Sequence, residues 1–192
     1  MKTLKLSKIV LGLSVMLVAN LGLAQDKMMS KDTKMVGGAA MYPSKNIVEN
    51  AVNSKDHTTL VAAVKAAELL DVLQSEGPFT VFAPTNAAFD KLPEGTVATL
   101  VMPENKMQLQ TILKYHVVAG KWSAKNIAKM IKKGKGKAVI KTVSGGTLTA
   151  WEKDGAVYVS DENGNSAQVT IADVNQSNGV IHVIDTVLLP KS

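Results

Sequence analysis

The residues best suited to acid–base or metal chemistry are three histidines, His57, His116 and His182, at intervals of 59 and 66 residues. Metal motifs place histidines a few residues apart, so this spacing predicts no local metal site. A triad could assemble in space from His116 or His182, Asp185 and a serine. No Gly-x-Ser-x-Gly elbow and no phosphate-binding glycine loop accompanies it. We therefore expect no catalysis, no metal centre and no cofactor.

His116 and His182 each lie within an apolar, strand-like run of the sequence. Buried histidines usually make hydrogen bonds to backbone groups. The pattern therefore predicts a structural role in the core for both histidines, with contact to a ligand or partner as the alternative.

The main electrostatic feature is a run of seven lysines without an acidic residue. These are Lys125, Lys129, Lys132, Lys133, Lys135, Lys137 and Lys141. A helix over residues 123–133 places the first four on one face, while Ile127 and Ile131 point the other way. Outside the cytosol such a patch suits a polyanion: acidic polysaccharide, lipid headgroups or released DNA. The alternative is a solvated face that keeps the protein soluble.

All 22 basic residues are lysine, and none is arginine. Bidentate recognition of guanine or phosphate usually uses arginine. This composition predicts no sequence-specific binding of nucleic acid.

Residues 1–24 are typical of a secretory signal peptide. Lys2, Lys5 and Lys8 precede a short apolar run, and Gly22 and Ala24 fit the small-residue positions before a cleavage site. The alternative is an uncleaved anchor, although a membrane span needs about 20 apolar residues. Removing the three signal lysines leaves 19 lysines against 16 acidic residues, a net charge of +3. We expect a secreted protein of the periplasm, cell surface or extracellular space, without a transmembrane span after cleavage.

The next segment, residues 25–42, is predicted to be a flexible linker because it shows no helical or strand period. It holds four methionines, Met28, Met29, Met35 and Met41, whose thioethers suit Cu(I). No histidine or cysteine joins them, which favours a plain linker. The chain has no cysteine at all, so its stability must come from burial rather than disulfides.

The pattern of the remaining chain predicts an α+β domain over residues 43–192. Helical spacing dominates residues 44–76, with Ser44 as a helix cap and a longer helix over 59–70. A buried strand at 79–83 and a helix capped by Thr85 follow. After residue 137, short β-branched strands alternate with glycine turns, as in a meandering sheet.

Three motifs resemble the fasciclin domain, in the order typical of that family. The first is Gly77-Pro78-Phe79-Thr80-Val81-Phe82-Ala83-Pro84-Thr85-Asn86, followed by Ala88-Phe89; the second is Leu113-Lys114-Tyr115-His116-Val117-Val118; the third is Asn178-Gly179-Val180-Ile181-His182-Val183-Ile184-Asp185, followed by Val187-Leu188-Leu189-Pro190. The resemblance covers residues 44–190, nearly the whole mature chain.

The resemblance implies a wedge-shaped β-sandwich with helices packed along one edge, and a role in extracellular adhesion without catalysis. In animal members of the family the tyrosine–histidine segment is linked to integrin binding, which marks Tyr115 and His116 as candidate partner-binding residues. The candidate residues from the lysine run are Lys125, Lys129, Lys132, Lys133, Lys135 and Lys137.

The sequence thus favours a secreted or surface-associated binding module for a surface or matrix component, such as an anionic polysaccharide or another protein, in adhesion or a biofilm. The alternative is a periplasmic carrier or stress protein that binds a small apolar ligand or Cu(I).

Overall fold

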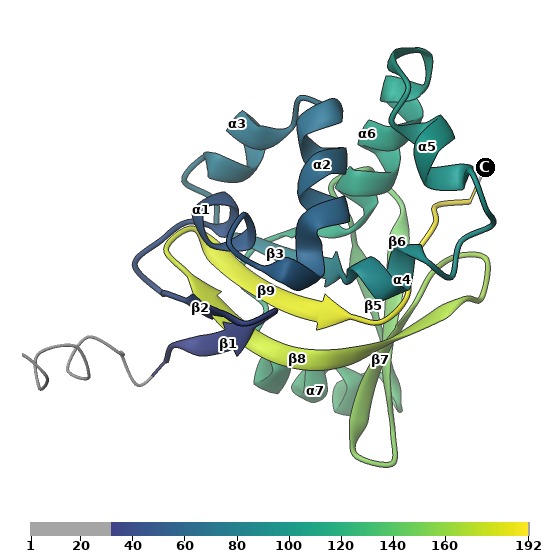
Figure 1. Ribbon diagram of the computed structural model, residues 1–192. Coiled ribbons are helices and arrows are strands. Elements are labelled where there is room, and N and C mark those ends of the chain that lie inside the picture. The colour runs from purple at the N-terminus through teal and green to yellow at the C-terminus, as the bar shows by residue number, and fades with distance from the viewer. Residues whose placement is uncertain (1–31, 192) are drawn as a thin grey trace, which may run out of the picture.

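The computed structural model describes residues 32–191. Short helices fill most of the first half of this range and strands fill most of the second half (Figure 1). The predicted α+β class is confirmed. The predicted signal peptide and the first part of the predicted linker lie outside the described residues.

The central element is a seven-stranded sheet in the order β4-β3-β9-β8-β7-β6-β5. Its strands are β3 (Phe79–Pro84), β4 (Val117–Ala119), β5 (Lys137–Lys141), β6 (Thr147–Lys153), β7 (Ala156–Ser160), β8 (Ser166–Gln176) and β9 (Gly179–Ile184). β3 and β9 pair in parallel, and the other neighbours pair antiparallel. Just after β5, the backbone N–H of Val143 donates to the carbonyl oxygen of Val117 in β4 at 2.8 Å. The curved sheet therefore nearly closes on itself.

The two halves of this sheet pack face to face across a buried core. Phe82 of β3 and Ile184 of β9 share one cluster with Leu148 of β6 and Val159 of β7. The long strand β8 pairs with β9 at one end and with β7 at the other, so it joins the two layers. The predicted β-sandwich is thus confirmed, and its two layers are continuous through β8.

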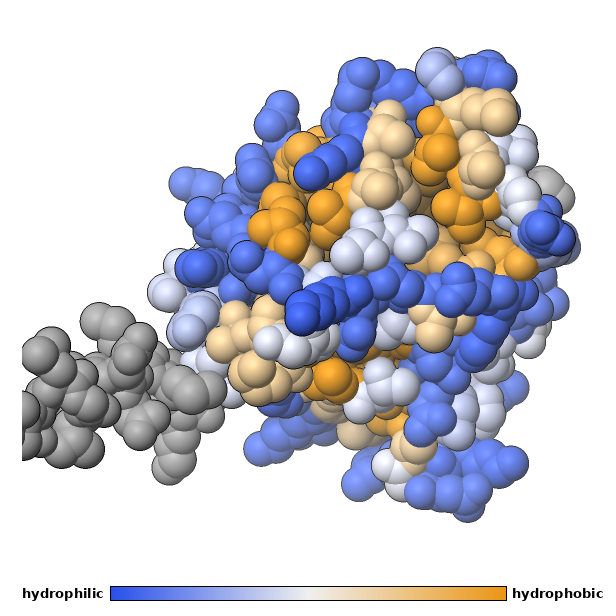
Figure 2. Space-filling view, viewed as in Figure 1, coloured by the Kyte–Doolittle hydropathy of each residue, from blue (hydrophilic) through white to orange (hydrophobic). Residues whose placement is uncertain are grey.

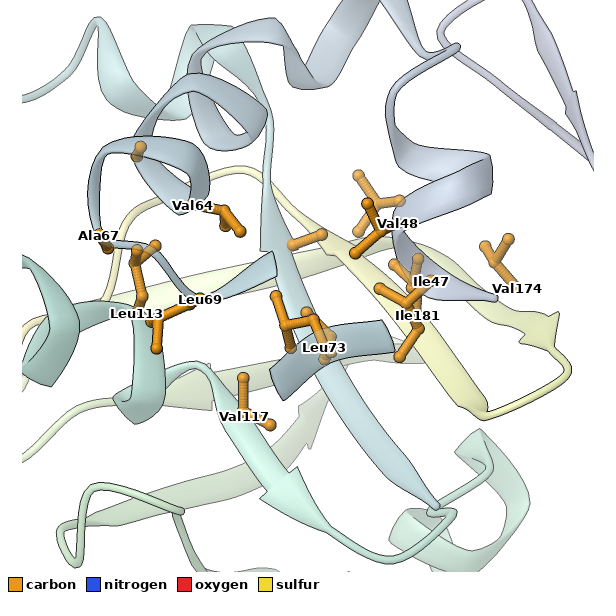
Figure 3. Packing of buried hydrophobic residues seen from close by; sticks show 14 of the residues in the cluster. Ile47, Val48, Val64, Ala67, Leu69, Leu73, Leu113, Val117, Val174 and Ile181 are labelled. Atoms are coloured by element: carbon orange, nitrogen blue, oxygen red, sulfur yellow. The ribbon is translucent and has the colours of Figure 1, made fainter. Parts of the chain in front are cut away.

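Helices cover the other face of β3 and β9. They are α1 (Ile47–Ala51), η2 (Lys55–His57), α2 (Thr58–Ala66), α3 (Leu70–Gln74), α4 (Asn86–Phe89), α5 (Thr96–Leu100), η3 (Pro103–Asn105) and α6 (Lys106–Tyr115). Side chains of this layer, among them Val64, Leu69 and Leu73, pack with Ile181 of β9 (Figure 3). Because both faces of β3 and β9 are covered, their sequences are almost continuously apolar. Apolar side chains also reach the surface among the helices (Figure 2).

The helix predicted over residues 59–70 is wrong in its last part. α2 ends at Ala66, and Glu68 adopts a φ of 54°. The N–H of Leu69 donates to Val64 O at 3.1 Å and that of Glu68 donates to Lys65 O at 3.0 Å, a Schellman motif. The motif turns Leu69 into the core. The sequence does not indicate this motif, because Glu68 occupies the left-handed position that glycine usually takes.

Helix caps were predicted with mixed success. The cap of α1 is Asn46 rather than Ser44, and Asn46 forms a capping box with Glu49. The predicted cap of α4 is confirmed, because the side chain of Thr85 accepts from Ala88 N.

The prediction of a flexible linker over residues 25–42 is wrong for its C-terminal part. β1 (Lys34–Val36) and β2 (Ala39–Met41) form an antiparallel hairpin. Its two-residue turn is Gly37-Gly38, with φ of 57° and 76°, as a type I′ turn requires. Val36 and Met41 are only 3% and 2% exposed and belong to the core beneath the helices. Strands of three residues are too short to show a period in the sequence, so the hairpin is seen only in the strand pairing and burial of the structure.

Candidate functional site

The lysine run forms an exposed surface on α7 (Ala124–Lys133) and the segment that follows it. The helix begins as predicted at Ser123, whose side chain accepts from Asn126 N, and it buries Ile127 and Ile131. The side chains of the run remain exposed. We call six of them the lysine surface: Lys125, Lys129, Lys132, Lys133, Lys135 and Lys137.

The N-terminus of α7 is held by a bulge in β8. Asp173 lies in this bulge with a φ of 53°, and its Oδ1 accepts from Ala124 N at 2.7 Å. The carboxylate thereby satisfies a free amide in the first turn and lies favourably in the dipole of the helix. The lysine surface is therefore attached to the sheet at a defined position.

His182 of β9 fixes the same region from beneath. Its Nδ1 accepts from Asp173 N at 3.2 Å, and its Nε2 donates to Trp122 O at 2.8 Å. Trp122 N in turn donates to Thr80 Oγ1 at 2.9 Å. The ring is neutral, because Nδ1 accepts a hydrogen bond and so carries no proton, and burial lowers the pKa of His182. The predicted core role of His182 is confirmed, and its effect is to hold the segment that leads into α7.

A hollow of about 470 Å³ lies between α7 and this segment. Its lining includes the side chains of Lys121, Trp122, Lys129 and Lys133. Lys129 and Lys133 are one helical turn apart and so share a face. No pattern in the sequence singles out Lys121 and Trp122, because they precede the helix and only the fold brings them beside it.

Carboxylates do not neutralise the lysine surface. Among residues 32–191 the ion pairs within 4.0 Å are Lys91–Asp185 and Lys106–Glu68. The charges of the lysine surface are thus available to an anionic ligand.

Tyr115 is not a surface residue. It is the last residue of α6 rather than part of a strand, and its side chain is fully buried. Its hydroxyl donates to Thr147 O at 2.6 Å and accepts from Glu162 N at 3.2 Å. Burial raises the pKa of Tyr115 to about 12. The residue connects α6 to the second half of the sheet.

His116 is likewise buried, at 3% exposure. Its Nδ1 donates to Ile112 O at 2.9 Å, and its Nε2 accepts from Leu188 N at 3.1 Å. Burial lowers its pKa to about 4, so the ring is neutral near pH 7. The predicted core role is confirmed. The assignment of Tyr115 and His116 as partner-binding residues is corrected, because neither side chain is accessible.

The histidines and Asp185 do not assemble into a triad. Both ring nitrogens of His116 and of His182 are engaged by backbone atoms. Asp185 instead accepts from Gln168 N at 2.8 Å and from Thr186 Oγ1 at 3.0 Å.

An apolar cavity of about 80 Å³ lies beneath the helices. Apolar side chains from α1, α2, α3, β3 and β9 line most of it, and the buried His57 borders it. The methionines of the hairpin do not converge on a metal site, since Met41 is buried and Met35 is 54% exposed. Within residues 32–191 no group of three or more histidine, cysteine or acidic side chains is arranged to hold a metal ion.

The sequence profile described as "Fasciclin domain" matches residues 55–190. The chain belongs to the fasciclin-domain family. This fasciclin domain is 48% identical over 161 residues to Protein sll1483 of Synechocystis sp., covering 84% of this chain and 82% of that protein. It is 38% identical over 147 residues to immunogenic protein MPB70 of Mycobacterium bovis, covering 74% and 67% of the two chains.

Relatives also occur in animals. Human periostin is 34% identical over 137 residues, which is 71% of this chain and 15% of periostin. The fold is also similar to part of a domain-pair structure from the insect cell adhesion molecule Fasciclin I. The TM-score is 0.66 and the identity 20%, over 74% of this chain and 50% of the other.

Within the described part of the chain, every helix is too short or too polar to cross a bilayer.

Proposed function

We propose that this fasciclin domain is a non-catalytic binding module that works outside the cytosol and attaches to an acidic polysaccharide through its lysine surface. The observation that carries the proposal is the lysine surface itself. Its six exposed lysines lie on α7 and the segment after it, and none of them pairs with a carboxylate among residues 32–191; β8 and β9 fix the position of the helix. The hollow beside Trp122 adds Lys121 and gives an anionic group a place among several ammonium groups.

Three further observations support this function class. Fasciclin I is described as a cell adhesion molecule, which favours adhesion over catalysis for the family. The sequence pattern of residues 1–24 favours export, which brings the domain to extracellular polymers. The absence of arginine favours a diffuse polyanion over a base-specific nucleic-acid site.

Retention on a polygalacturonate column tests the proposal. Retention should fall steeply as salt rises, because a polyelectrolyte releases counterions when lysines bind it. The variant Lys132→Glu/Lys133→Glu should elute at clearly lower salt than the wild type.

Lys55→Glu/Lys65→Glu is the matched control, with the same charge change at exposed lysines of η2 and α2. Equal loss of retention in both double variants would show an effect of net charge alone and would reject the lysine surface as the site. Retention that ignores salt would reject the proposal as a whole.

The alternative function, a carrier of an apolar ligand or Cu(I), has weaker support. The apolar cavity of about 80 Å³ is smaller than ligand sites, which usually measure about 300–1,000 Å³. Met41, one of the candidate copper ligands, contributes its side chain to the core. Stoichiometric, saturable heat in a calorimetric titration with Cu(I) or a lipid would favour the carrier over the adhesion module.

A further inference from the structure

The outward face of β5, β6 and β7 carries an aromatic pair that lies outside the hydrophobic core. In these strands Ala138, Ile140, Leu148, Ala150 and Val159 are buried in the core between the two layers. Because side chains alternate along a strand, the residues between them point outward. Those residues are Lys137, Val139, Lys141, Thr147, Thr149, Trp151, Lys153, Ala156, Tyr158 and Ser160.

Trp151 and Tyr158 lie side by side at the centre of this face. They are direct cross-strand partners, and their rings stack with centroids 4.7 Å apart and an interplanar angle of 18°. Each side chain is half-buried and so leaves part of its ring in solvent. Trp151 Nε1 donates to Ser160 Oγ at 2.8 Å, and Ser160 Oγ is 2.8 Å from Ser166 Oγ. The indole is thus held in one orientation before any ligand arrives, which reduces the entropy lost on binding.

Two lysines flank the aromatic pair on this face. Lys137 is the direct cross-strand partner of Trp151 on the opposite side from Tyr158. Lys153 lies two residues further along β6, so it points to the same side. None of the outward positions of these three strands carries an acidic residue. Lys137 also belongs to the lysine surface, so the aromatic face continues directly from it.

This combination matches the chemistry of an acidic sugar. The apolar C–H face of a pyranose ring packs on an aromatic ring, because the negative face of the ring attracts weakly positive hydrogens. A carboxylate on the sugar then pairs with an adjacent ammonium group. The row Lys137, Trp151, Tyr158 crosses three strands about 4.8 Å apart, so it extends about 10 Å, enough for a short stretch of a sugar chain.

We propose that the outer face of β5–β7 is a binding site for uronic-acid polysaccharide, with sugar rings on Trp151 and Tyr158 and carboxylates at Lys137 and Lys153. The proposal rests on the proposed attachment to acidic polysaccharide and assigns the sugar rings to a site on the sheet, separate from the hollow beside α7.

The test is titration of the intact domain with polygalacturonate at low salt. Trp151→Ala and Tyr158→Ala should each weaken binding at least tenfold, and Lys137→Gln should weaken it several-fold. Val139→Ala is the matched control: Val139 is 64% exposed on the same face but outside the aromatic row, so its loss should leave affinity unchanged. Dextran, a neutral polymer, should bind far more weakly than polygalacturonate.

Tryptophan emission distinguishes binding beside α7 from binding on the sheet. The chain has two tryptophans: Trp122 lines the hollow beside α7, and Trp151 lies on the outward face of the sheet. Binding on the sheet should shift the emission of Trp151, and Trp151→Phe should abolish that shift while retaining more affinity than Trp151→Ala. If Trp151→Ala does not fold, Trp151→Phe and Tyr158→Ala are used to test the proposal.

The outcomes distinguish the two proposals. Wild-type affinity in folded Trp151→Phe and Tyr158→Ala, together with loss in Lys132→Glu/Lys133→Glu, overturns the site on the sheet and leaves the proposed function in place. If affinity falls only in the aromatic variants, the site on the sheet is supported and the lysines of α7 do not take part in binding. Absence of any binding to polygalacturonate overturns both.

Discussion

The two motif histidines act as neutral hydrogen-bonding groups that join separate parts of the backbone. His116 joins the end of α6 to the C-terminal segment, through Ile112 and Leu188. His182 joins the bulge of β8 to the segment before α7, through Asp173 and Trp122. Each ring donates with one nitrogen and accepts with the other, so a second proton would leave a backbone N–H facing a ring N–H.

Stability should therefore fall as the solution is acidified from pH 6.5 towards pH 4. The pKa of His116 is about 4 in the folded chain, against 6.5 for an unperturbed ring. Above pH 6.5 the ring is neutral in both states and the full stability is present. Between pH 6.5 and 4 the unfolded chain takes up a proton that the folded chain does not, which costs up to about 3 kcal/mol.

Urea unfolding at several pH values measures this effect. Burial also lowers the pKa values of His57 and His182, so these residues add to the slope in the same direction. His116→Gln should make the slope shallower. A free energy of unfolding that stays constant from pH 6.5 to 4.5 would contradict the neutral, buried state of these rings.

Tyr115→Phe should reduce stability without changing polysaccharide binding. The change removes the hydroxyl and leaves Thr147 O and Glu162 N without this partner, at a cost of about 1–2 kcal/mol. Thermal unfolding and column retention should be measured on the same preparation. Loss of retention with an unchanged melting temperature would instead favour a direct role in partner contact.

At the scale of the element, the C-terminus of α7 shows how the lysine surface turns from helix to strand. The N–H of Gly136 donates to Ile131 O at 2.8 Å, and that of Lys135 donates to Lys132 O at 3.3 Å, a Schellman motif. The left-handed position is Lys135, with a φ of 55°, although glycines stand on both sides of it. Gly134 is needed for a different reason: a Cβ there would lie 1.9 Å from Lys137 O.

Two substitutions at this turn should have opposite effects on stability. Lys135→Gly should stabilise the domain by about 0.5–1 kcal/mol, because glycine adopts the left-handed conformation without steric cost. Gly134→Ala should destabilise it, because the added methyl group overlaps a backbone carbonyl. Chemical denaturation measures both changes, and a stabilising Gly134→Ala would show that the turn is not as described.

At the scale of the whole molecule, the N-terminal hairpin is part of the core rather than a tether. Val36 and Met41 pack in the same cluster as residues of α1, α2 and β9. Domain boundaries drawn at residue 43 would remove both side chains and expose the apolar surface that they cover.

Met41→Ala should therefore destabilise the domain by about 2–5 kcal/mol, as is usual for a buried methionine. Met35→Ala is the matched control on the same hairpin, because Met35 is 54% exposed and should contribute little. Urea midpoints of the two variants test this. Equal midpoints would mean that the hairpin is not packed in solution.

Local patterns in the sequence were sufficient for most of the fold. β-Branched runs and glycine turns predicted the meandering sheet of the second half, and the helical pattern over residues 123–133 predicted α7 correctly. The three motifs identified the family, because their order and spacing span nearly the whole domain. The exposure of the four helical lysines followed from their face of the helix.

Only the tertiary structure decided which candidate side chains a partner can reach. Tyr115 and His116 stand among apolar residues, and sequence cannot tell whether such a run ends a helix inside the core or faces outward. The aromatic face depends on the pairing of Lys137, Trp151 and Tyr158 across three strands, and that register is set by the turns and by the burial of the alternate residues. Contacts between distant segments determine accessibility, and a linear pattern records only neighbours along the chain.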